Sequence, residues 1–377
     1  MPMQDSDVGV LVQRGIDLLQ EGRFEAALAD FDRAIQLDGS SPWALANRAL
    51  AYGQMGRFEA ALADFDRAVH LEPNDPWVWT NRAIACGLMG RFEEAIASFT
   101  QAIRLDARNP DAQASRGETY RAMGRFEEAV ADFTRAVALD PSHAGAFVGR
   151  GEVFRMTYRF KEALADFTRA VELIPDYTGA LASRGETYRA MGRFEAAVAD
   201  FSRAVELDEG YVAAIVSRGI AYRQMGRLEE SLADFDRAIR LDPNDAMAVA
   251  GRGETYRQMR QYLRALGDFD RAVALDPDLA AAYAGRGETH RLADDFAAAL
   301  EDFDRAVALD DRDSWIYAHR GETHRQMSRN EEAVADFTRA IELDSQNTWA
   351  VAGRGETYRR MGRYVEASVD LERAGGR

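Results

Sequence analysis

The chain has 377 residues, of which 47% are hydrophobic, and a net charge of −16. This surplus of acid disfavours nucleic acid and anionic membranes as main partners, since both are negatively charged. A single cysteine, Cys86, excludes an intrachain disulfide and favours a reducing compartment. The N-terminal sequence carries neither a basic leader nor a membrane-spanning apolar run, so we expect a cytoplasmic protein.

An arginine recurs every 34 residues along the sequence. The copies are Arg14, Arg48, Arg82, Arg116, Arg150, Arg184, Arg218, Arg252, Arg286, Arg320 and Arg354. They define uninterrupted repeats at residues 8–41, 42–75, 76–109, 110–143, 144–177, 178–211, 212–245, 246–279, 280–313, 314–347 and 348–377. A fixed period of this length is typical of solenoids, whose units bury apolar surface mainly against their neighbours. We therefore expect residues 1–377 to form one elongated array.

The fourth repeat, residues 110–143, has the pattern of two helices. Apolar or small residues recur at helical spacing on both sides of Gly124. Gly124 suits the left-handed turn that closes the first helix, and Pro141 prevents the second helix from continuing. Such short helices are marginal alone in water, so stacking must stabilise them. Ala136 is alanine in every repeat, which indicates a close approach of the two helices.

This pattern resembles the tetratricopeptide repeat, in the form of a bacterial-type array. The residues that carry the resemblance are Gly117, Tyr120, Ala129, Phe133 and Pro141. The resemblance extends from residue 8 to about residue 374. It implies an all-α solenoid of eleven helix-turn-helix repeats, wound as a right-handed superhelix. It also implies a concave groove, lined by the first helices, that binds proteins or peptides.

One departure from the family pattern recurs in all eleven repeats, where arginine replaces the leucine of the signature. An aspartate follows sixteen residues later in ten of them, as Asp132 follows Arg116, and only Ser98 breaks the rule. We interpret the two as an ion pair between the helices of one hairpin, with bidentate geometry available. The alternative is an arginine ladder that binds a ligand.

In the first three repeats the offsets that the family places in the groove are apolar. They include Leu50, Ile84 and Leu88. Trp43 and Trp77 stand second in their repeats, at an offset that also resembles a groove contact. Contiguous exposed apolar surface marks an interaction site, so we predict a protein-binding groove here.

From the fourth repeat onward the same offsets are charged. Glu118 and Glu186 are followed three residues later by Arg121 and Arg189, and later repeats continue this pattern, with Ile220 as its exception. The two charges can pair within a solvated ladder. Alternatively, they capture a charged peptide.

Two further tryptophans, Trp315 and Trp349, occupy the second position of the tenth and eleventh repeats. Together with the N-terminal pair they could frame an extended ligand along the groove. Alternatively, each tryptophan packs on the preceding repeat.

The turn glycine is replaced in repeats eight to ten, by Arg260, Asp294 and Ser328, and Asn330 takes an aromatic position. We expect the least stable hairpin there. In the last repeat Val365 and Val369 stand at offsets that are usually Glu, Lys or Ala. They predict self-association, unless the chain belongs to a longer protein.

The sequence offers no nucleophile–base pair, no phosphate-binding loop and no metal-ligand set, so we expect neither catalysis nor a metal or other cofactor. The leading hypothesis is a scaffold that binds a protein or peptide ligand. The alternatives are a self-assembling homo-oligomer and the regulatory arm of a larger protein.

Overall fold

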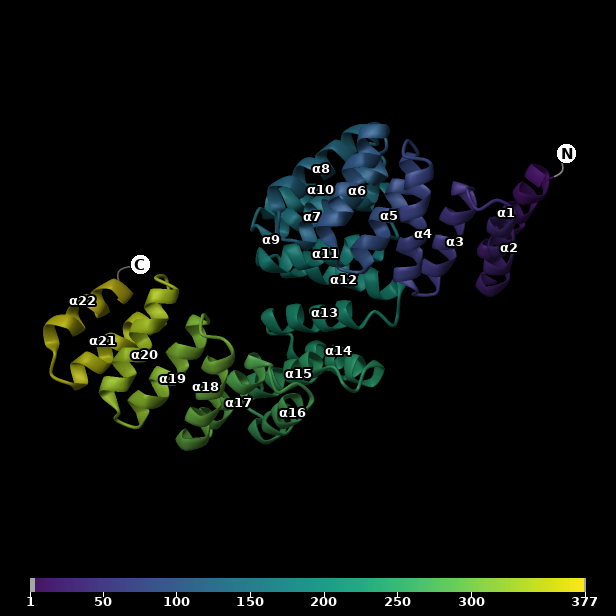
Figure 1. Cartoon of the computed structure of the whole chain (residues 1–377). Coiled ribbons are helices and arrows are strands. Elements are labelled where there is room, and N and C mark those ends of the chain that lie inside the picture. Colours follow the sequence, from purple (N-terminus) through teal and green to yellow (C-terminus); the bar gives the residue numbers. More distant parts are fainter. Residues whose placement is uncertain (1–3, 376–377) are drawn as a thin grey trace. The chain divides into compact units, whose positions relative to one another are not determined.

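The computed structural model describes residues 4–375 as antiparallel helix pairs, and the predicted all-α fold of eleven helix-turn-helix repeats is confirmed (Figure 1). The helices are α1 (Gln4–Gln20), α2 (Phe24–Leu37), α3 (Pro42–Gln54), α4 (Phe58–Leu71), α5 (Pro76–Leu88), α6 (Phe92–Leu105), α7 (Pro110–Ala122), α8 (Phe126–Leu139), α9 (Ala144–Met156), α10 (Phe160–Leu173), α11 (Thr178–Ala190), α12 (Phe194–Leu207), α13 (Val212–Gln224), α14 (Leu228–Leu241), α15 (Ala246–Gln258), α16 (Tyr262–Leu275), α17 (Ala280–Leu292), α18 (Phe296–Leu309), α19 (Ser314–Gln326), α20 (Asn330–Leu343), α21 (Thr348–Arg360) and α22 (Tyr364–Gly375).

The helices belong to two compact units, which divide between Thr187 and Tyr188 within α11. In each unit the first helix of a repeat packs against the second, and the second packs against the next first helix. The single domain expected from the repeat period stays a prediction. None of the described helices combines the length and the apolarity that a bilayer crossing requires.

The pair α7 and α8 illustrates how the sequence sets the helix ends. The Asn109 side chain accepts a hydrogen bond from the Ala112 N–H at 3.0 Å, and Pro110 follows as the first helical residue. Gly124 then adopts a φ of 71°, the left-handed conformation that ends α7. The Asp140 N–H donates to the Ala136 carbonyl and completes α8.

All turns between the paired helices keep this left-handed conformation, including those without glycine. Within residues 4–375, four non-glycine residues have φ near 60°, namely Tyr158, Arg260, Asp294 and Ser328. Three of these replacements were noted in the sequence, whereas Tyr158 of the fifth repeat was not. The repeat geometry therefore imposes a backbone conformation that costs these side chains energy.

The core is a row of phenylalanines on the second helices. Phe133 is fully buried, and a Cβ on Gly117 of the same repeat would lie 3.2 Å from its ring. A Cβ on Gly149 of the next repeat would lie only 2.5 Å from the same ring. Small residues of two successive repeats thus enclose one aromatic ring, and Ala136 is buried beside it.

The repeat arginine connects three helices. Arg116 donates from Nε and Nη2 to the two carboxylate oxygens of Asp132, at 2.7 and 2.8 Å. Its remaining nitrogen, Nη1, donates to Thr100 Oγ1 of the preceding repeat at 2.9 Å. The hydrogen bond with Asp132 raises the pKa of Arg116. All three nitrogens of the guanidinium thus donate hydrogen bonds within the fold. This arrangement favours the ion pair over the alternative of an arginine ladder that binds a ligand.

Candidate functional site

The first helices of the N-terminal repeats form a groove of about 680 Å³, which we call the N-terminal groove. Helices α1, α3 and α5 supply most of its lining. The residues are Ile16, Leu19, Gln20, Gly22, Phe24, Trp43, Asn47, Leu50, Gln54 and Trp77. Aliphatic and aromatic side chains dominate this set, so the groove suits an apolar ligand with few polar groups.

The indole rings of Trp43 and Trp77 stack, with centroids 5.3 Å apart and planes inclined by 27°. They nevertheless remain 56% and 36% exposed. Asn47 holds the backbone beneath the first ring, because its side-chain amide donates to the Trp43 carbonyl at 2.8 Å. Asn81 makes the equivalent bond to Trp77 at 2.9 Å. The structure thus brings Trp43, Trp77 and Leu50 together in one fixed site.

Ile84 and Leu88 extend the apolar surface along α5 beyond the groove lining. Both are exposed, Leu88 to 63%. They lie seven and eleven residues after Trp77, which places all three on one face of the helix. A Cβ on the neighbouring Gly53 or Gly87 would meet no atom within 4 Å, so the surface between these side chains is open.

The predicted charged offsets differ in environment along the chain. Arg121 donates to Glu118 at 2.8 Å, and both side chains are at least one-third exposed. Glu186 and Arg189 lie on α11, on opposite sides of the division between the two units.

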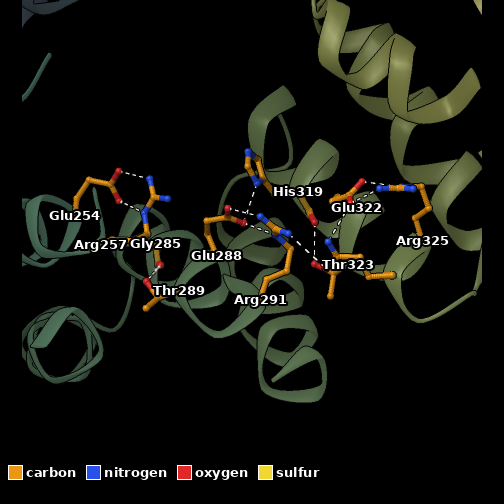
Figure 2. Close-up of polar contacts among 11 residues, drawn as sticks. Glu254, Arg257, Gly285, Glu288, Thr289, Arg291, His319, Glu322, Thr323 and Arg325 are labelled. Carbon is orange, nitrogen blue, oxygen red and sulfur yellow. Dashed lines mark hydrogen bonds and ion pairs between the residues drawn. The ribbon is translucent and has the colours of Figure 1, made fainter. Parts of the chain in front are cut away.

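Three Glu–Arg pairs of the second unit are more deeply buried. Figure 2 shows three successive pairs, Glu254–Arg257, Glu288–Arg291 and Glu322–Arg325. Arg291 donates to both carboxylate oxygens of Glu288, each at 2.7 Å. Glu288 is 3% exposed. Burial opposes its ionisation, but hydrogen bonds from Arg291 and His319 outweigh that effect and lower its pKa to about 2.

His319 was not singled out in the sequence, yet it joins both C-terminal tryptophans. Its ring lies 3.8 Å from that of Trp315 and 4.6 Å from that of Trp349, centroid to centroid. Its Nδ1 lies 2.9 Å from Glu288 Oε2 (Figure 2). The sequence does contain a signal for this contact, because His319 follows Trp315 by four residues and therefore lies on the same face of the helix. Trp349 also contacts Phe337 of the preceding repeat edge to face, so these tryptophans pack within the array while remaining partly exposed.

A second groove of about 300 Å³ lies in the second unit, and we call it the C-terminal groove. Its lining mixes charge with small and apolar residues. These residues are Ile220, Arg223, Met247, Ala250, Gly251, Glu254, Arg257, Phe269, Ala281, Ala284, Gly285, Asp313 and Trp315. Trp315 is among the groove residues that the sequence predicts, Arg223, Glu254 and Arg257 belong to its charged pattern, and Ile220 is the exception to that pattern.

The last helix, α22, exposes apolar side chains. Val365 is 78% and Val369 61% exposed, and Tyr364 is exposed beside them. Leu371 replaces the core phenylalanine of the other repeats and is itself partly exposed. These residues leave α22 with an apolar face that the described chain does not cover.

No cluster of three or more His, Cys, Asp or Glu side chains suited to a metal ion occurs within residues 4–375. Cys86 is a fully buried free thiol, and its burial raises its pKa.

Sequence models of the tetratricopeptide repeat match most of the chain. One model matches residues 115–178, 183–246 and 251–314. Others of the same description match residues 13–78, 65–97 and 316–347, and a TPR repeat model matches residues 88–124. No curated protein matches the sequence significantly.

Solved structures share the fold. A tetratricopeptide repeat protein from Parabacteroides merdae is 22% identical, with a TM-score of 0.57 over 66% of this chain and 98% of its own. The Cut9–Hcn1 hetero-tetramer of the APC/C contains a chain 14% identical, with a TM-score of 0.54 over 99% of this chain and 87% of its own. Yeast Tom70 is 15% identical, with a TM-score of 0.50 over 98% of this chain and 97% of its own. At these identities the likeness concerns the fold alone.

Proposed function

Because the chain belongs to the tetratricopeptide repeat family, we propose that it is a non-catalytic scaffold that binds an apolar segment of a partner protein in the N-terminal groove. The observation that carries this proposal is the pair of stacked, exposed tryptophans above an aliphatic groove. Rigid aromatic side chains at the centre of a contact area supply most of the binding energy in protein interfaces. A reducing, cytoplasmic setting is part of the proposal, supported by the buried free thiol.

The occupant we propose is a peptide segment with aromatic or aliphatic anchors at helical or extended spacing. Gln20, Asn47 and Gln54 are the polar side chains in the lining, but the Asn47 amide already bonds to the backbone. The groove therefore offers mainly apolar contacts, and the surface continues along α5 to Ile84 and Leu88. A segment that reached from Leu50 to Leu88 would bury both side chains.

The test is selection of peptides from a random display library on the wild-type protein, followed by fluorescence anisotropy. We expect the double variant Leu50→Glu, Leu88→Glu to weaken selected apolar peptides at least tenfold, because a charge then faces apolar ligand surface. Leu263→Glu changes an 88% exposed leucine on α16 and should leave binding unchanged. Selected peptides that bind the double variant as well as the wild type would refute the N-terminal groove as the site.

A second candidate function, self-association, is favoured by the exposed valines on α22. We propose that a second copy of this chain covers Val365 and Val369. Light scattering over a hundredfold concentration range should then give a rising molar mass. The variant Val365→Glu, Val369→Glu should remain monomeric, and a constant monomer mass for the wild type would exclude this candidate.

A further inference from the structure

The charged ladder of the second unit is incomplete at one position. In repeats eight, nine and ten a glutamate precedes the groove arginine by three residues and accepts hydrogen bonds from it (Figure 2). In the seventh repeat Ile220 occupies the glutamate position, three residues before Arg223. An isoleucine cannot accept a hydrogen bond or balance a charge, so Arg223 lacks the partner that its counterparts have.

Arg223 contacts a carboxylate that it has to share. Its Nη1 lies 3.4 Å from Glu254 Oε1, and Arg257 donates to both oxygens of the same carboxylate. The Nε of Arg223 is buried and has no hydrogen-bond partner. The side chain is 18% exposed, so water screens it weakly. Two guanidinium groups therefore share the charge of one carboxylate.

This shortage of negative charge has an electrostatic consequence. Burial, followed by the nearby charges of Arg257 and Arg189, lowers the pKa of Arg223 to about 10. The group stays protonated near pH 7, but its buried charge is poorly compensated, which is costly. An anion that paired with the guanidinium would relieve that cost and would gain a charge-assisted hydrogen bond.

The walls of the C-terminal groove indicate which anion fits. Arg223 lies beside Ala250, Gly251, Ala284 and Gly285, whose small side chains leave about 300 Å³ open in front of it. Met247 and Trp315 line the same groove and are 52% and 37% exposed. A ligand that fills this groove places one anionic group at the arginine and apolar groups against the methionine and tryptophan.

The charge balance favours a monoanion. Glu254 and Asp313 also line the groove, so a dianion would meet two carboxylates. Asp313 is already engaged, since it accepts the Trp315 N–H at 2.7 Å at the start of α19. Arg223 and Arg257 share Glu254, so a single carboxylate from a ligand suits the positive charge that Glu254 leaves.

We propose that Arg223 is the anion-binding residue of a second peptide site, which takes a carboxylate side chain flanked by apolar residues. The site lies in the second unit and does not depend on the N-terminal groove. Its distinguishing feature is Ile220, which leaves the arginine open to a carboxylate from a ligand where the other repeats supply their own.

The experiment follows the Nε–H resonance of Arg223 by nitrogen-15 NMR. The probe is an N-acetylated five-residue peptide that alternates leucine and glutamate, and the comparisons are its glutamine counterpart and inorganic phosphate. We expect a saturable shift with the glutamate peptide and at least tenfold weaker binding of both comparisons. Equal binding of the glutamine peptide would overturn the anion site, and equal or tighter binding of phosphate would overturn the carboxylate preference.

The decisive variant is Ile220→Glu, which restores the glutamate of the other repeats. Because the new carboxylate would occupy Arg223, peptide binding should fall at least tenfold, and the melting temperature should not fall. Leu263→Glu adds the same charge at an exposed position of α16 outside the groove, and it should bind within threefold of the wild type. Undiminished peptide binding by Ile220→Glu would refute the proposal. Leu50→Glu, in the other unit, should leave this binding unchanged.

Discussion

At the residue scale, the repeat arginine contributes to register as well as to charge balance. Arg116 contacts α8 of its own repeat through Asp132 and α6 of the preceding repeat through Thr100. Aspartates replace Thr100 in several repeats, so that Arg48 contacts both Asp32 and Asp64. The sixteen-residue spacing indicated the contact between Arg116 and Asp132 within one repeat. The contact with Thr100 of the preceding repeat depends on how neighbouring repeats stack.

The first prediction compares loss of a carboxylate with loss of a hydroxyl at the same repeat position. Asp132→Ala should destabilise by about 2–4 kcal/mol, because it leaves the largely buried Arg116 without its main partner. Ser98→Ala should cost about 1 kcal/mol, since Arg82 keeps Asp66 at 2.7 Å. Urea unfolding monitored by circular dichroism measures both. Equal midpoint shifts would contradict the buried-pair interpretation.

The second prediction concerns the small residues between paired helices. Ala136→Leu should destabilise by about 1–3 kcal/mol, because the buried site beside Phe133 has no room for three more carbons. Ala122→Leu, on an exposed position of α7, is the matched control and should change stability by less than about 0.5 kcal/mol. An unchanged midpoint for Ala136→Leu would refute close packing at this position.

At the element scale, the turns between paired helices are set by repeat geometry more than by residue type. Gly226 and Arg260 occupy equivalent turns with φ of 73° and 59°. Arg260→Gly should therefore stabilise by about 0.5–1 kcal/mol, by removing the penalty of a left-handed arginine. Gly226→Ala should destabilise, although its Cβ would meet no atom within 4 Å. Thermal unfolding measures both, and a lower melting temperature for Arg260→Gly would argue against turn strain.

The hairpin of α19 and α20 combines two unfavourable features. Ser328 is left-handed, and Asn330 has a buried Oδ1 without a hydrogen-bond partner. An unsatisfied buried polar atom costs about 1–3 kcal/mol. We expect amides from Ser328 to Asn330 to exchange with deuterium earlier than those of the equivalent turn at Gly226, and Asn330→Phe to slow that exchange. Equal protection in the wild type would contradict this expectation.

At the scale of the whole molecule, stability depends on ionised carboxylates such as Glu288, whose pKa is lowered to about 2. A folded-state pKa below that of the unfolded chain stabilises the fold above about pH 4.5. This stabilisation disappears as the pH falls from about 4.5 to about 2. At neutral pH, Glu288→Gln should lower the melting temperature clearly, and near pH 2 the wild type and variant should melt together. An equal difference at both pH values would show that Glu288 does not act through its charge.

The sequence determined the helix pairs, their turns and the row of core phenylalanines. These features follow from residue spacing and local backbone preference, and both recur every 34 residues. It also placed Trp43, Trp77 and Leu50 on the same helix faces, which the structure joins in the N-terminal groove. The tertiary structure alone decided the burial of Glu288, the stacking of His319 between two tryptophans and the unsatisfied Nε of Arg223. Each of these depends on the distance between helices of different repeats, and the period of the sequence does not specify that distance.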